Sequence, residues 1–136
     1  MRTIELTLGD IQAATADIPA DAPVFMLNML RYKARAEYAE AGQAPCSGRE
    51  VYHQRYRPAF RRIAEASGAK VVWVGGVLAK LVAPPGAQWD EVAIAEYPSF
   101  AAFRRIIENP RYKAEAAPHR RAALEDWRLI AMAKAF

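Results

Sequence analysis

The chain has 136 residues, of which 53% are hydrophobic, 25% charged and 10% aromatic, with a formal net charge of +4. This profile predicts one globular domain over residues 1–136, and the single cysteine, Cys46, excludes an intrachain disulfide. The basic residues are interleaved with acidic ones, no apolar run spans a membrane and no signal peptide opens the chain, so we expect a cytoplasmic protein without nucleic-acid or membrane partners.

The first predicted elements are a short helix and an apolar strand. Asp10 can cap a helix that continues to Ala16, and Pro19 ends it. The run Val24–Tyr32 then predicts a strand. It is apolar on both faces, so we expect both sides of the sheet to be covered.

A longer helix follows. The spacing of Ser47 and Glu50 matches a capping box and predicts its start, and Gly68 fits a left-handed C-terminal cap. Between them, aromatic and aliphatic residues recur every three to four positions and form one apolar stripe. Pro58 interrupts this pattern, so a kink is expected near Arg57.

The second half of the chain alternates strands and helices. Residues 70–82 predict one strand, in which the pair Gly75–Gly76 indicates a bulge or a close backbone approach. Residues 89–97 predict its antiparallel partner. Ser99 can cap the next helix, Asn109 and Pro110 end it and begin another helical stretch, and residues 126–133 predict a fourth strand.

These elements follow the order βαββαβ, which predicts an α+β, ferredoxin-like fold with a four-stranded antiparallel sheet. The helices suffice to cover one face of that sheet. Because its other face is also apolar, we expect a second copy of the chain to cover it in a homodimer.

Several short segments carry a resemblance to a known family: residues 26–32, 47–50, 75–76, 89–90, 97–99, 109–112 and 119–126. On these, the chain resembles the bacterial family called domain of unknown function 1330, in the dimeric α/β-barrel superfamily, over roughly the core 23–136. The resemblance implies a dimeric α/β barrel and no settled activity, since the superfamily holds isomerases, cofactor-free monooxygenases and haem-binding branches. The N-terminal extension 1–22 and an insert around 34–46 depart from shorter members.

A ligand pocket is predicted between the sheet and its helices, near the end of the first strand. Asn28 interrupts an apolar strand and is either a ligand contact or a structural amide. Arg31 can hold a carboxylate, or is an ordinary exposed arginine. The candidate walls are aromatic residues that also fit plain core or interface positions. They are Tyr52, Tyr56, Trp73 and Tyr112.

Candidate catalytic residues are fewer. Glu96 and Arg128 either pair with each other, lie at solvated strand ends, or place a general base and a ligand-binding arginine at the cavity mouth. His119 is a proton shuttle, a haem ligand or a capping or surface histidine, and His53 is a weaker candidate. Neither histidine has metal-site spacing and no nucleotide or serine-hydrolase motif is present, so we predict neither a metal nor a cofactor.

Two functions therefore remain open. The first is a binding or regulatory module that takes a small hydrophobic or aromatic ligand. The second is a cofactor-independent isomerase, cyclase or monooxygenase that acts on a small aromatic or polyketide-like substrate.

Overall fold

The structure is a computed structural model that describes residues 1–40 and 46–136. Its strands are β1 (Val24–Tyr32), β2 (Lys70–Gly76), β3 (Glu91–Tyr97) and β4 (Leu124–Met132). Its α-helices are α1 (Leu8–Thr15), α2 (Gly48–Val51), α3 (Arg57–Ala64), α4 (Phe100–Ile107) and α5 (Ala117–Ala123). Two π-helical segments, Tyr52–Tyr56 and Tyr112–Ala116, precede α3 and α5, and a 3-10 turn at Glu65–Ser67 follows α3. The strands form one antiparallel sheet in the order β2-β3-β1-β4, as the predicted topology requires. The part of the predicted insert at 41–45 lies outside the described residues.

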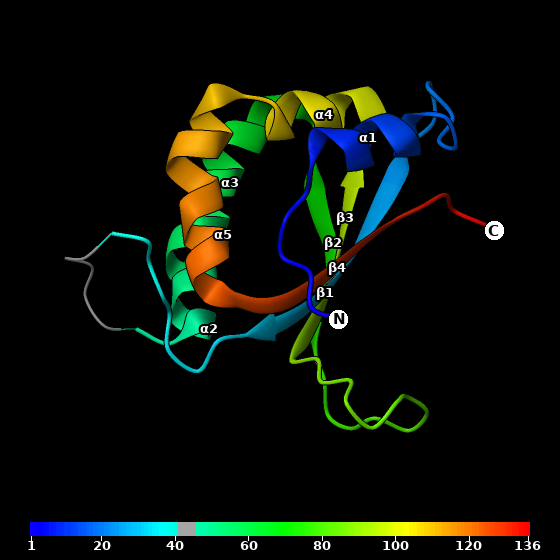
Figure 1. Cartoon of the computed structure of the whole chain (residues 1–136). Helices are drawn as coiled ribbons and strands as arrows, with labels where there is room; N and C mark the ends of the chain where they lie inside the picture. Colours follow the sequence, from blue (N-terminus) through cyan, green and yellow to red (C-terminus); the bar gives the residue numbers. More distant parts are fainter. Residues whose placement is uncertain (41–45) are drawn as a thin grey trace.

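The helices pack on one side of the sheet (Figure 1). Even-numbered residues of β1, such as Met26 and Leu30, face these helices and are buried in the core. The alternate residues face the opposite side, because successive side chains of a strand point to opposite faces. Within 1–40 and 46–136, no helix is long and apolar enough to cross a membrane.

The first helix is capped differently from the prediction. Thr7, not Asp10, is the N-cap: its hydroxyl accepts from the Asp10 amide at 3.0 Å, while the Asp10 carboxylate accepts from the Thr7 amide at 3.0 Å. Asp10 therefore occupies the acidic position of a capping box. The helix contributes Ile11 to the core, so the N-terminal extension packs against the rest of the fold.

The second helical run begins and ends where its sequence predicts. Ser47 and Glu50 form the reciprocal capping box that precedes α2. Gly68 ends the run in the left-handed conformation, with φ of +79°.

The two internal prolines each follow a π-helical segment. The residue before Pro58 donates its amide to the Tyr52 carbonyl, and the residue before Pro118 donates to the Tyr112 carbonyl, five positions back in each case. Proline disrupts the α-helical ladder through its missing N–H and its ring. The predicted break near Arg57 is therefore a widened helical turn, which π-helical geometry accommodates.

The edge strand β2 is shorter than predicted, since it ends at Gly76 rather than at residue 82. Its register shifts between Val71 and Trp73, so the irregularity lies at Val72 and not at the glycine pair. Gly75 instead lies under the Trp73 ring, whose nearest atom would be 2.2 Å from an added Cβ. The close neighbour of Gly75 is thus a side chain, this indole, rather than the backbone expected at the glycine pair.

Candidate ligand cavity

A cavity of 470 Å³ lies between the helix-facing side of the sheet and the helices above it. Its sheet wall includes Asn28, Lys70, Val71, Glu91, Ala93, Ala95, Tyr97, Trp127 and Leu129. Its helical wall includes Tyr52, Tyr56, Phe60, Phe103, Ile107 and Tyr112. Most of this surface is apolar or aromatic, with a few polar groups, as is usual for small-molecule sites.

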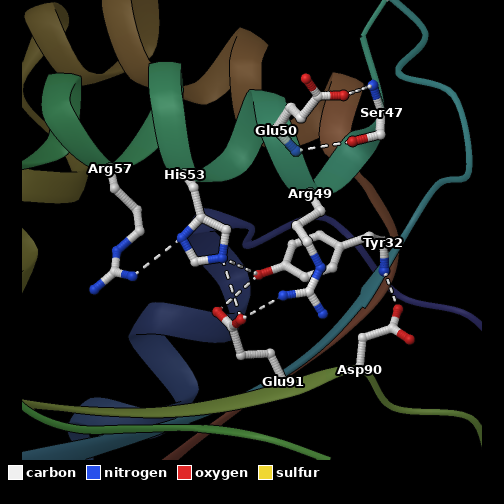
Figure 2. A network of polar contacts seen from close by, with 8 residues as sticks. All are labelled: Tyr32, Ser47, Arg49, Glu50, His53, Arg57, Asp90 and Glu91. Atoms are coloured by element: carbon white, nitrogen blue, oxygen red, sulfur yellow. Dashed lines mark hydrogen bonds and ion pairs between the residues drawn. The ribbon is translucent and has the colours of Figure 1, made fainter.

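Glu91 is the acidic centre of one end of this cavity. It begins β3, its side chain is only 6% exposed, and it reaches toward the helix that carries Arg49 and His53 (Figure 2). Its carboxylate accepts from the Tyr32 hydroxyl at 2.9 Å and from Arg49 Nη1 at 3.3 Å, and lies 3.1 Å from His53 Nε2. A buried carboxylate needs such partners, because an unpaired charge is costly to bury.

The hydrogen bonds around His53 determine its tautomer. Arg57 Nη1 lies 3.2 Å from His53 Nδ1, and a guanidinium can only donate. Nδ1 is therefore the acceptor, and Nε2 carries the proton that is donated to Glu91. His53 thus links Glu91 with Arg57, and both of these residues line the cavity.

The adjacent acid, Asp90, fixes the end of β1 beside this network. Its carboxylate accepts from the Tyr32 amide at 2.8 Å, and its own amide donates to the Leu30 carbonyl at 2.8 Å. Burial, followed by the hydrogen bond to Glu91, raises the pKa of the Tyr32 hydroxyl well above the usual tyrosine range. Tyr32 therefore remains a protonated donor to Glu91.

A second polar group lies behind the aromatic wall. The Tyr56 and Tyr112 hydroxyls are 3.0 Å apart, and Arg120 Nη1 donates to the Tyr112 hydroxyl at 2.6 Å. Arg120 is only 3% exposed, and its guanidinium lies over the Trp127 ring at 4.9 Å from the centroid. Arg120 Nη2 also lies 3.6 Å from the Glu5 carboxylate.

Four of the predicted ligand residues line the cavity: Asn28, Tyr52, Tyr56 and Tyr112. The Asn28 side-chain oxygen accepts from the Trp127 indole at 3.1 Å, and its amide nitrogen lies 3.3 Å from the Met26 carbonyl. Asn28 therefore has structural hydrogen bonds in addition to its place in the wall.

The other three predicted ligand residues lie elsewhere. Arg31 lines a second, separate hollow together with Trp89. Trp73 is 56% exposed on the edge strand and does not contribute to the cavity wall. Arg128 lies over the Trp89 ring at 5.1 Å and contacts Asp126, so the expected pairing with Glu96 does not occur.

The two predicted catalytic candidates are also outside the cavity. Glu96 lies 3.8 Å from Lys70 at the exposed end of the sheet. His119 Nδ1 lies 2.6 Å from the Tyr38 hydroxyl. Burial, and then the charge of Arg55, lowers the pKa of His119, which favours its neutral form.

The structure thus assigns the polar centre to Glu91, with His53 and Arg57, rather than to Glu96 and His119. A signal for Glu91 was present in the sequence. It has the same alternation phase as Ala93, Ala95 and Tyr97, so it faces the helices with them. In the part of the chain that the structure describes, no three His, Cys, Asp or Glu side chains are grouped to hold a metal ion.

Comparisons with known proteins give structural relatives without an assigned function. No protein-family model and no curated protein matches the chain, so membership of the domain of unknown function 1330 family stays a prediction. A solved structure of a Rhodopseudomonas palustris protein of unknown function, RPA0582, is 35% identical with a TM-score of 0.87, covering 100% of this chain and 99% of that one. The methylated RPA0582 protein is 36% identical with a TM-score of 0.88, covering 99% and 96%.

A more distant neighbour bears on the fold alone. A DABB family protein with a ferredoxin-like fold, from Mesorhizobium loti, has a TM-score of 0.52 at 12% identity, covering 84% of this chain and 98% of that one. It confirms the predicted ferredoxin-like α+β fold. The similarity to RPA0582 extends over nearly the whole chain, including the N-terminal segment that was predicted to be an extension. The chain therefore belongs to the same family as the RPA0582 protein of Rhodopseudomonas palustris.

Proposed function

We propose that this protein binds a small, largely aromatic molecule in the cavity between its sheet and its helices. The observation that carries this proposal is a 470 Å³ cavity whose wall combines apolar side chains with the Glu91 carboxylate. A row of aromatic rings lines one side of the cavity: the ring centroids of Tyr52 and Tyr56 are 4.9 Å apart and those of Tyr56 and Phe60 are 6.0 Å apart, with ring planes inclined by 30° and 32°. A planar ligand can stack on such a surface.

Cavity filling tests this proposal with a hydrocarbon probe, α-methylstyrene. Ala93 contributes to the sheet wall, so Ala93→Leu places extra carbon atoms inside the cavity. We expect calorimetric titration to show binding to the wild type and an affinity at least about tenfold weaker in this variant. Ala101→Leu makes the same change on the exposed side of α4 and should bind like the wild type. Binding that Ala93→Leu leaves unchanged would contradict the proposal.

The Glu91–His53 pair favours a second candidate function, proton transfer without a cofactor. A buried carboxylate on a cavity wall can accept a proton from a ligand C–H that is acidified by a neighbouring carbonyl. For acetophenone, Glu91 would take a methyl proton, the C–H electron pair would form the enolate double bond, and the carbonyl oxygen would become negative. In D₂O, the exchanged carboxyl group then returns a deuteron to the carbon.

Deuterium uptake by acetophenone measures this activity directly. The expected result is protein-dependent exchange of the methyl protons, lowered by about 100-fold in Glu91→Gln. Glu96→Gln, which changes an acid outside the cavity, should exchange at the wild-type rate. Equal exchange rates with wild type and Glu91→Gln would leave ligand binding as the function and remove the catalytic alternative.

The proposal includes a homodimer formed by the sheet face opposite the helices. One cross-strand row on that face consists of Trp73, Ile94, Leu27 and Ile130. Trp73 and Ile130 are exposed large apolar residues, at 56% and 47%. A contiguous apolar surface of this kind marks an interaction site in a folded protein, and a second copy offers the same surface.

A further inference from the structure

Four tyrosine side chains from three elements meet in the cavity wall: Tyr52, Tyr56, Tyr97 and Tyr112. All four are buried, with Tyr52 at 8% and Tyr97 at 4% exposure. Two come from the first π-helical segment, one from the end of β3 and one from the second π-helical segment. The ring centroids of Tyr52 and Tyr56 are 4.9 Å apart, and those of Tyr56 and Tyr112 are 6.4 Å apart.

A count of hydroxyl protons shows an excess of donors in this group. The Tyr56 and Tyr112 hydroxyls bond to each other, so one of their two protons is used and the other is left over. The Tyr52 and Tyr97 hydroxyls have no hydrogen-bond partner in residues 1–40 and 46–136. A hydroxyl on a cavity wall that has no protein partner is available to bond a ligand or water. The cavity therefore holds three hydroxyl protons that no described protein group accepts.

These hydroxyls remain donors over the ordinary pH range. Burial raises the pKa of Tyr52, Tyr56 and Tyr97 above the usual tyrosine value. Arg120 adds positive charge behind the group through its bond to the Tyr112 hydroxyl. Its Nε atom is itself buried without a partner among the described residues. Donors backed by a positive charge favour an electron-rich oxygen in the cavity.

We propose that the tyrosine group binds the carbonyl or anionic oxygen of an aromatic ligand. This inference rests on the proposed binding function and specifies its chemistry: an aromatic ketone, aldehyde, phenolate or enolate rather than a plain hydrocarbon. The oxygen lies against the Tyr52, Tyr97 and Tyr56–Tyr112 hydroxyls, and the ring stacks on the aromatic wall. A carbonyl that becomes an enolate gains negative charge on the oxygen that these donors would bind.

Two probes of nearly equal shape separate oxygen recognition from cavity filling. Acetophenone carries a carbonyl where α-methylstyrene carries a CH₂ group. We expect the carbonyl stretching frequency of bound acetophenone to be lowered by the tyrosine donors. In the double variant Tyr52→Phe/Tyr97→Phe this frequency should rise, and acetophenone should bind about fivefold or more weakly. The affinity of α-methylstyrene should stay within about twofold of the wild type.

The melting temperature of the ligand-free protein distinguishes a ligand-binding role of these hydroxyls from a structural one. Because Tyr52 and Tyr97 donate to no described residue, the double variant should melt at the wild-type temperature or higher. Tyr38→Phe is the matched control: its hydroxyl lies outside the cavity and contacts His119 and Arg55, so acetophenone binding should be unchanged.

Three results would count against the inference. A double variant that keeps both the carbonyl frequency and the acetophenone affinity of the wild type would overturn it, while α-methylstyrene binding would leave the proposed function intact. A double variant that melts at a lower temperature and binds acetophenone normally would assign the hydroxyls a structural role instead. Failure of both probes to bind the wild type would overturn the inference and the proposed function together.

Discussion

Glu91→Ala is expected to lower the free energy of unfolding by about 3 kcal/mol. The carboxylate that it removes is 6% exposed and accepts from Tyr32, His53 and Arg49. Its loss leaves the Tyr32 hydroxyl and the His53 Nε2 proton without their acceptor, and each such group carries a desolvation penalty. Urea denaturation at neutral pH, followed by circular dichroism, measures the change.

Glu96→Ala provides the control for the same substitution. Glu96 is partly buried and lies 3.8 Å from Lys70, whose side chain is 67% exposed, and a single ion pair with an exposed partner contributes little to stability. Glu96→Ala should therefore lower the free energy of unfolding by less than about 0.5 kcal/mol. If the two variants lose equal stability, the hydrogen bonds of Glu91 do not hold β3 against the helix. That result would also contradict a role for Glu91 in shaping the cavity.

Ile94→Lys is expected to convert a homodimer into a monomer. Ile94 lies at the centre of the cross-strand row, between Leu27 and Trp73, on the face opposite the helices. A charge buried in the middle of an apolar interface has no partner, so the dissociation constant should rise by about 100-fold or more. Light scattering at micromolar concentration should give twice the 15.1 kDa chain mass for the wild type and the chain mass for the variant.

Ala101→Lys introduces the same charge on the exposed side of α4 and should remain dimeric. A wild-type protein that scatters as a monomer would remove the barrel arrangement, because an obligate sheet-to-sheet interface should bury on the order of 2,000 Å² or more. In that case the exposed row would need a different partner.

The fold was largely predictable because its local patterns agree with one another. The apolar run Val24–Tyr32 became a strand with those bounds, and the Ser47–Glu50 spacing and Gly68 set the helix ends. Where two residues compete for one role, the pattern was insufficient. Thr7 and Asp10 can both cap α1, and only the local backbone decides which does. Strand β2 ended early because β-type composition alone does not show where pairing with β3 stops.

The candidate site was less predictable, because its residues come together only through tertiary packing. Glu91 and His53 are 38 positions apart in the chain, and the register of β3 and the orientation of the helix bring them to 3.1 Å. Glu96 has the opposite alternation phase from Glu91, so the same strand directs one acid toward the helices and the other away from them. Asn28, by contrast, was identifiable, because a polar residue within an apolar strand is unusual in itself.

The paired π-helical turns have a consequence for tracing this cavity among related chains. Each begins at a tyrosine that is followed six positions later by a proline, Tyr52 with Pro58 and Tyr112 with Pro118. A π turn is equivalent to one residue inserted into an α-helix, and each residue turns an α-helix by about 100°. Deleting that residue would rotate one half of the helix against the other and direct different side chains at the sheet. Two occurrences of the Tyr-x5-Pro spacing are therefore a sequence signature of the helical wall of this cavity. A chain with the same strands but only one of these spacings would enclose a differently lined space.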